Sequence, residues 1–172
     1  MEVLPDLIEP DLTTLFCGSA ASSASARYEA YYAGPGNRFW LVLQETGLTP
    51  RLFAPPEFPR LSALGIGLTD LAKNETGADR DFSTSSYDCS GLRKKIDKAS
   101  PAIIAFTGKR PASIFLMRSL GIGTEDYGEQ SARLGQTRIF VLPSPSGAAR
   151  RWWSPEPWHS LAATHREIRD MI

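Results

Sequence analysis

The chain has 172 residues, of which 42% are apolar, and its 19 lysines and arginines balance 19 aspartates and glutamates. This length and composition suit one globular domain, and the zero formal charge excludes a protein whose whole surface attracts nucleic acid. Any such affinity must come from local basic patches, and the chain offers three: Arg93-Lys94-Lys95, Lys109-Arg110 and Arg150-Arg151. Each patch alone is also what an ordinary solvated surface shows.

The predicted elements alternate between short apolar strands and helices. The first half contains a strand over Leu12–Gly18, a small-residue loop to Ala26, a helix over Asn37–Thr46, an extended or turning segment with four prolines over Leu48–Arg60, and an apolar segment over Leu64–Leu71 followed by a loop past Asp81. The second half contains a helix over Ser90–Lys98, a strand over Pro101–Phe106, a turn at Thr107 and Gly108, a helix through Met117, a strand over Thr137–Leu142 and a closing helix over Pro157–Ile172.

This alternation predicts a single three-layer α/β/α domain over residues 1–172, with a central, mostly parallel sheet of short strands. Ligands of such sheets bind beyond the carboxyl ends of the strands. The loops after Phe16, Phe106 and Leu142 should therefore converge on one mouth.

The sequence does not indicate a metal, another cofactor or a membrane. Two cysteines, Cys17 and Cys89, are too few for a structural zinc or a four-cysteine iron–sulfur cluster, and Cys17 lies in an apolar run typical of a buried thiol. The acidic, proline-broken stretch from Met1 to Pro10 is unlike a signal peptide, and nothing approaches a membrane span. We therefore expect a cytoplasmic protein.

The loop from Gly18 to Ala26 consists almost entirely of glycine, alanine and serine. Small side chains let backbone N–H groups approach a ligand closely, as anion and carbonyl sites require. Flexible surface turns have the same composition, and the spacing is not that of a Walker phosphate loop.

Three segments carry motifs of one family. Gly34–Trp40 reads GPGNRFW, Gly65–Leu71 reads GIGLTDL, and Ser144–Gly147 reads SPSG. In this order and spacing, the chain resembles the mismatch-specific uracil/thymine DNA glycosylases of the uracil-DNA glycosylase superfamily. Those proteins combine a Cys-Gly-apolar-Asn-Pro-Gly start with a Pro-x-Asn-Arg-Phe-Trp finish. The resemblance spans nearly the whole chain.

The resemblance implies a uracil-DNA glycosylase-like fold and a monofunctional enzyme that flips uracil, or another deaminated or damaged base, out of DNA. It would hydrolyse the N-glycosidic bond without a metal or cofactor and leave an abasic site. The implied partner is uracil-containing DNA, double- or single-stranded, and we expect the protein to be a monomer.

The resemblance also assigns the base-binding residues. Gly18, Ser19 and Ala20 match backbone positions that face the base, and Tyr32 matches the aromatic residue that stacks on the flipped uracil and donates its backbone N–H. Half-buried packing beside two neighbouring tyrosines is the alternative for Tyr32.

A second set of residues is implied to contact DNA. The residues near the abasic sugar, its phosphates and the gap in the duplex are Ser144, Ser146, Gly147, Ala148, Arg150 and Arg151. Ala148 replaces the large apolar wedge of the family. Trp152 and Trp153 could supply a stacking wedge instead, or pack against the last helix with Trp158.

The sequence departs from the family most clearly at Ala20, where the family carries a water-positioning asparagine. Glycosidic cleavage builds positive charge on the sugar, so the reaction needs an anion or an oriented water on that side. Asp70, at the end of an apolar segment, is therefore the predicted catalytic residue. A helix N-cap or loop carboxylate is its alternative. Lys73 could contact a phosphate or tune Asp70, but we expect it to be an ordinary surface lysine.

Two other functions stay open at this point. Without the family asparagine, the protein could be a catalytically inactive binder of damaged or abasic DNA. Its zero net charge and small-residue loop would also suit a hydrolase of small nucleosides.

Overall fold

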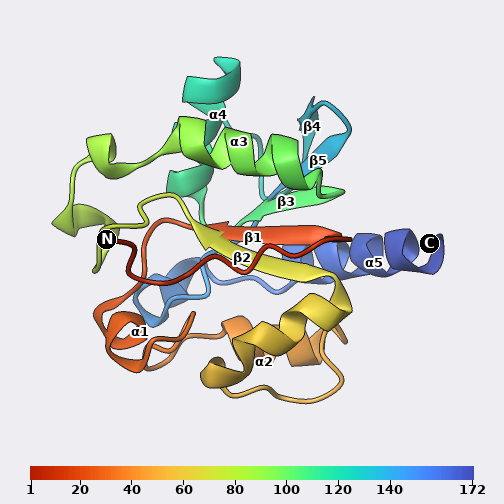
Figure 1. Ribbon diagram of the computed structural model, residues 1–172, viewed down its shortest axis with the longest axis horizontal. Coiled ribbons are helices and arrows are strands. Elements are labelled where there is room, and N and C mark those ends of the chain that lie inside the picture. Colours follow the sequence, from red (N-terminus) through yellow and green to blue (C-terminus); the bar gives the residue numbers. More distant parts are fainter.

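The apolar runs of the sequence form a five-stranded sheet in the computed structural model, which describes residues 1–172 (Figure 1). The strands lie in the order β2-β1-β3-β5-β4. All neighbouring strands are parallel except β4, which runs antiparallel to β5. Their bounds are β1 Thr14–Gly18, β2 Ile66–Asp70, β3 Ile103–Phe106, β4 Gly128–Leu134 and β5 Thr137–Val141.

Helices cover both faces of the sheet (Figure 1). The helices are α1 Ser23–Tyr28, α2 Phe39–Glu45, α3 Cys89–Ala99, α4 Lys109–Leu120 and α5 Glu156–Asp170. Side chains alternate along each strand, so the apolar residues divide between two cores. Phe16 and Leu68 pack with α2 and α5 on one face, and Cys17 and Ile104 pack with α3 and α4 on the other. The predicted single α/β domain with a mostly parallel sheet is confirmed.

Two segments predicted as irregular chain are helical. The proline-rich segment contains a 3₁₀ helix over Pro55–Leu64. It begins with a proline, whose missing N–H is not needed at a helix start, and Glu57 accepts a hydrogen bond from the N–H of Ala54 at 2.9 Å. The small-residue loop contains α1, because Ser22 caps it by accepting from the N–H of Ser25 at 3.0 Å.

Strand β4 was not predicted from the sequence. It forms an edge of the sheet, and only Gln130 and Leu134 of its seven residues are buried. A strand that is exposed on its outer edge and on much of both faces lacks the apolar run by which buried strands are recognised.

The chain before β1 covers the edge of β2 at the other side of the sheet (Figure 1). Leu7 and Leu68 exchange two backbone hydrogen bonds of 2.9 Å each in an antiparallel bridge, and the N–H of Val3 donates to the carbonyl of Lys73 at 2.8 Å. This N-terminal segment therefore protects an edge strand and brings Asp6 close to the carboxyl end of β2. None of the helices combines the length and the apolar character needed to cross a membrane.

Candidate active site

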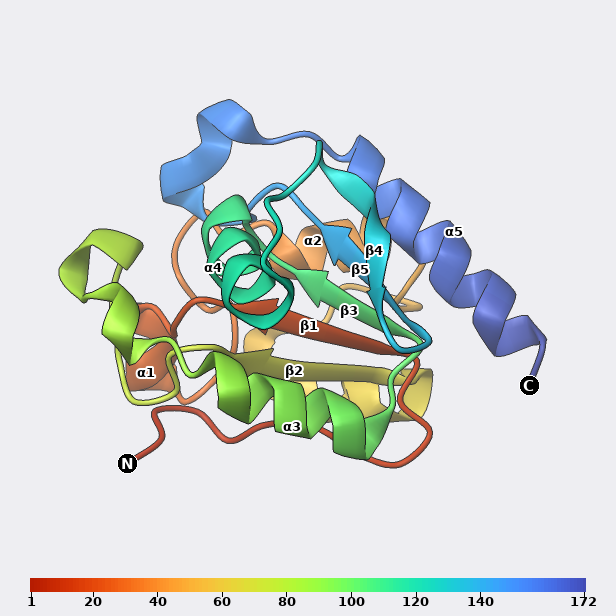
Figure 2. The same ribbon diagram turned by 90° about the horizontal axis from the view of Figure 1, so that it is seen from above.

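The carboxyl ends of three neighbouring strands place three residues side by side. Gly18 ends β1 and pairs in register with Asp70 at the end of β2. Thr107 follows Phe106 of β3, which pairs with Cys17 on the other side of β1. Because side chains alternate along a strand, Asp70 and Thr107 lie on the same face of the sheet at Gly18. Figure 2 shows these strand ends pointing toward the side of the molecule where α1 and the segment Gly147–Trp152 lie.

Three polar groups converge on the space above the Cα of Gly18. A Cβ atom at this position would lie 2.9 Å from Oδ1 of Asp70, 3.3 Å from the Thr107 hydroxyl and 3.4 Å from the Tyr32 hydroxyl. A contact below 3.0 Å between a Cβ and a fixed neighbour forces something to move. The glycine is therefore required by the close approach of these groups.

Tyr32 is held in a strained conformation by its surroundings. Its φ of 53° lies in the left-handed region, which costs a non-glycine residue about 1–3 kcal/mol and is often found at functional sites. Its ring stacks on Phe39, with 3.9 Å between ring centroids and 15° between planes. Its hydroxyl lies 3.0 Å from the hydroxyl of Thr107. Packing and a hydrogen bond thus fix both ends of the side chain.

Of the two neighbouring tyrosines considered from the sequence as packing partners of the partly buried Tyr32, only Tyr31 lies beside it. Tyr28 is exposed, and the Tyr31 ring centroid lies 6.2 Å from that of Tyr32. The stacked partner of Tyr32 is Phe39, from the GPGNRFW motif.

Asp70 is the one carboxylic acid among the buried residues, with 6% of its surface exposed. Burial raises its pKa to about 6, a shift that Asp6 increases and that Lys73, Lys95 and hydrogen bonding to the Gly18 backbone oppose. At neutral pH such a carboxylate is mostly ionised, yet it is basic enough to accept a proton from a reacting water. Asp70 lies on a strand and caps no helix.

The start of the small-residue loop is held by backbone hydrogen bonds from the residues that follow β2. The carbonyls of Gly18 and Ser19 accept hydrogen bonds from the N–H groups of Leu71 and Ala72, at 2.9 and 2.7 Å. Ala20 packs against the apolar cluster under α3 and α4. Its methyl group thus contributes to packing.

The two other motifs meet in space although they are more than 100 residues apart in the sequence. The N–H of Arg38 donates to the carbonyl of Pro145 at 2.8 Å. A Cβ on Gly147 would lie 3.1 Å from the carbonyl oxygen of Pro35, so the two loops are in close backbone contact. Ser144 in turn lies beside Gly108, the residue that follows Thr107. The GPGNRFW and SPSG segments therefore border the same strand ends.

The two tryptophans after this loop have different surroundings. Gly147–Trp152 forms a short 3₁₀ helix with Ala148, Arg150 and Arg151 exposed, and the Trp152 side chain is 63% exposed. Trp153 packs on Trp158 of α5, with 5.9 Å between ring centroids, and the Arg38 guanidinium lies over its ring. Trp153 is thus partly buried and packed against the core, whereas Trp152 is available at the surface.

Lys73 is not the surface lysine that the sequence analysis expected. Its side chain is only 9% exposed, and its ammonium lies 2.9 Å from Oδ1 of Asp6 and donates to the Tyr31 hydroxyl at 3.1 Å. That expectation is wrong because the N-terminal segment covers this part of the sheet edge, a long-range contact without a local sequence signal.

The three basic patches also have different surroundings. Lys109 and Arg110 are exposed in the first turn of α4, directly after Thr107 and Gly108, so they border the candidate site. On α3, Arg93 lies 3.5 Å from Asp97 and Lys95 lies 2.6 Å from Asp6. The α3 patch is therefore partly neutralised within the protein.

A cavity of about 980 Å³ lies at the other end of the sheet. Its lining includes Thr13, Ala102 and Gln136, which precede β1, β3 and β5. This places it at the amino ends of the strands, away from Asp70 and the sequence motifs. No group of three or more His, Cys, Asp and Glu side chains is arranged to hold a metal ion.

Sequence reasoning missed Thr107 and Asp6. Thr107 was assigned to a turn, although a hydroxyl residue directly after a buried strand is a recognisable signal in a sheet whose ligands bind at strand ends. Asp6 carries no such signal, because its position depends on pairing between Leu7 and Leu68.

Comparisons with known proteins give one family match and similar solved structures. The family model "Uracil DNA glycosylase superfamily" matches residues 5–165. Among solved structures, the chain is similar to the solution NMR structure of a protein from Methanosarcina acetivorans that carries the provisional name uracil DNA glycosylase. The two share 26% sequence identity with a TM-score of 0.63, over 95% of this chain and 96% of the other.

Proposed function

This chain belongs to the uracil DNA glycosylase superfamily, and on that premise we propose that it is a DNA glycosylase of the mismatch-specific uracil type. It flips uracil out of DNA and hydrolyses the N-glycosidic bond, leaving an abasic site. The observation that carries the proposal is the convergence of the Asp70 carboxylate with the Tyr32 and Thr107 hydroxyls above Gly18, at the carboxyl ends of three strands.

Asp70 is the proposed catalytic residue. As the C1′–N bond breaks, its electron pair leaves with the base and positive charge develops on the sugar. The Asp70 carboxylate stabilises that charge and accepts a proton from the water whose oxygen bonds to C1′. Its burial strengthens the attraction for the developing cation, and its pKa of about 6 leaves it ionised at neutral pH.

The base is proposed to stack on Tyr32. Phe39 supports one face of the ring, so the base uses the other face. The backbone of Gly18 is proposed to face the base, and the N–H groups of Ser19, Ala20 and Tyr32 are the proposed donors to the base, which leaves with negative charge. The carbonyls of Gly18 and Ser19 are already bonded to the chain after β2, which fixes the backbone around those donors.

The segment from Ser144 to Arg151, which begins with the SPSG motif, is the proposed DNA contact. Ser144 and Ser146 border the abasic sugar and its phosphates, and the rest of the contact comes from Gly147, Ala148, Arg150 and Arg151. Because Trp152 is exposed and Trp153 is packed, Trp152 is the side chain that fills the gap left by the flipped base.

The alanine at position 20 favours a second candidate function, in which the protein binds damaged or abasic DNA without cleaving the glycosidic bond. The family asparagine is absent there, and the partly buried Ala20 packs against the apolar cluster under α3 and α4. The buried carboxylate of Asp70 argues against this candidate, because an ionisable group in the core destabilises a fold that does not use it.

A substrate panel distinguishes the two. Oligonucleotides with uracil, hypoxanthine, xanthine or ethenocytosine, each opposite all four bases and in single strands, are incubated with wild type, Asp70→Asn and the surface control Asp170→Asn. The proposed enzyme releases base from at least the uracil substrates, loses that activity with Asp70→Asn and keeps it with Asp170→Asn. Binding without release of any base would select the inactive binder.

A further inference from the structure

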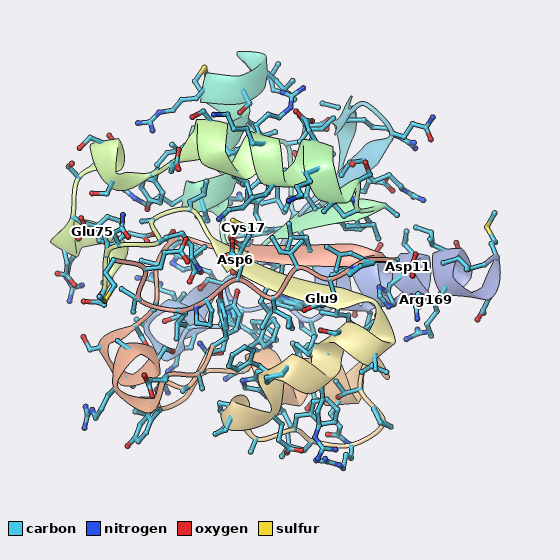
Figure 3. All side chains as sticks on the ribbon, in the orientation of Figure 1. Asp6, Glu9, Asp11, Cys17, Glu75 and Arg169 are labelled. Atoms are coloured by element: carbon cyan, nitrogen blue, oxygen red, sulfur yellow. The ribbon has the colours of Figure 1, made fainter.

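A cluster of charged side chains lies next to Asp70. It does not include the Tyr32 and Thr107 hydroxyls that converge with Asp70 above Gly18. Asp6 is at its centre: Oδ1 lies 2.9 Å from the Lys73 ammonium, and Oδ2 lies 2.6 Å from the Lys95 ammonium. The Thr69 hydroxyl also donates to Oδ1, at 2.7 Å. One carboxylate thus joins the N-terminal segment, β2, the loop after β2 and α3; Figure 3 labels Asp6 on the N-terminal segment.

Lys73 has little freedom within this cluster. Besides Asp6, its ammonium donates to the Tyr31 hydroxyl at 3.1 Å and lies over the Tyr31 ring. The Tyr31 hydroxyl itself donates to the carbonyl of Pro5 at 2.9 Å, and the backbone of Lys73 is bonded to Val3. Side chain and backbone are therefore both tied to the N-terminal segment, three residues after Asp70.

The charges of this cluster do not balance without Asp70. Two ammonium groups share the single carboxylate of Asp6, which leaves one positive charge in excess. The other titratable groups whose pKa Asp70 affects are Tyr31, Tyr32 and Cys17, and burial raises the pKa of each, so all three stay neutral around neutral pH. Both lysines lower the pKa of Asp70, so an ionised Asp70 would offset this excess charge.

We propose that Lys73, fixed by Asp6, is a positioning residue that keeps Asp70 in its carboxylate form for the reaction. The inference rests on the proposed catalytic role of Asp70. Removing a carboxylate from water disfavours its charged form, and a cation held nearby in the same low-dielectric region offsets that effect. The N-terminal segment, which carries Asp6, is by this account a functional part of the site.

The test is the pH dependence of single-turnover base release from uracil-containing DNA, measured for wild type, Lys73→Met, Lys73→Arg and Lys98→Met. Replacing Lys73 with methionine moves the acid limb of the profile upward by about one pH unit, which is about a tenfold lower rate at pH values below both limbs. The rate at pH 8.5 stays close to that of wild type. Lys73→Arg has the wild-type limb. Lys98→Met, which replaces an exposed lysine in the last turn of α3, leaves the limb unchanged.

A second readout does not depend on activity. The carboxyl carbon of Asp70 is followed by NMR during a pH titration, and its midpoint should rise in Lys73→Met by the same amount as the kinetic limb. Lys95→Met, at a more exposed member of the cluster, should raise it less and serves if Lys73→Met does not fold.

An unshifted midpoint in a folded Lys73→Met, with a rate reduced equally at every pH, would overturn the inference and leave the role of Asp70 intact. If Lys95→Met is used instead, an unshifted midpoint of the Asp70 titration would likewise overturn the inference. Full activity of Asp70→Asn would instead overturn the proposed function.

Discussion

The buried carboxylate of Asp70 should destabilise the fold that contains it. Its pKa is about 6 in the folded protein against an ordinary 3.8. Stability from a raised pKa is fully present below the unfolded value and is lost as the pH rises through the folded value. The shift of about two units therefore removes about 3 kcal/mol of unfolding free energy between pH 3.5 and pH 8.

Asp70→Asn removes this dependence, because the amide does not titrate. Urea unfolding of wild type and Asp70→Asn at pH 3.5 and pH 8 gives four free energies of unfolding. The stability of the variant relative to wild type should improve by about 3 kcal/mol from the lower to the higher pH. Comparing the two pH values cancels effects of the amide that do not depend on pH.

Asp170→Asn serves as the matched control, because Asp170 is exposed at the end of α5. Its stability relative to wild type should change little between the two pH values. If the relative stability of Asp70→Asn is the same at both, the carboxylate is not held at a raised pKa, and the electrostatic reasoning about the site fails.

Three further predictions concern the same site. Wild-type base release should decrease toward acid with a midpoint near pH 6, because protonated Asp70 cannot accept a proton; a flat single-turnover profile from pH 5 to 8 would contradict this. Gly18→Ala should reduce the rate at least tenfold, because its Cβ would lie 2.9 Å from the Asp70 carboxylate, and a wild-type rate would refute the tight packing. Trp152→Ala should weaken activity on duplex substrates more than on single strands and leave the melting temperature of the protein unchanged. Trp153→Ala should lower the melting temperature, because Trp153 packs on Trp158. The reverse pattern would contradict the roles given to the two tryptophans.

The sequence predicted those parts of the fold that depend on local patterns. Apolar runs such as Ile103–Phe106 define the central strands, and their alternation with helices predicts a parallel sheet. From this it follows that Asp70 lies at a strand end, next to the loop after β1. The catalytic role proposed for Asp70 does not follow from the apolar pattern. It came from the charge that glycosidic cleavage builds on the sugar and from the departure from the family motif at Ala20.

The parts that sequence analysis missed depend on contacts between distant segments. Lys73 reads as a polar surface residue, and only the pairing of Leu7 with Leu68 buries it against Asp6. Thr107 becomes part of the site through its register with Gly18. Strand β4 is polar because it lies at an edge, so its sequence resembles a loop. Burial and register are properties of the assembled sheet, and local residue patterns do not encode them.

The central claim is that Asp70 performs the chemistry in place of the asparagine that Ala20 replaces. Its most direct test is the single-turnover rate of uracil release from one U:G duplex at pH 8, with DNA binding measured on the same samples, for wild type, Asp70→Asn and Asp170→Asn. The account predicts a loss of at least a hundredfold in rate for Asp70→Asn, with DNA affinity retained and with Asp170→Asn unchanged, as about 3 kcal/mol of transition-state stabilisation requires. A wild-type rate in a folded Asp70→Asn would contradict it.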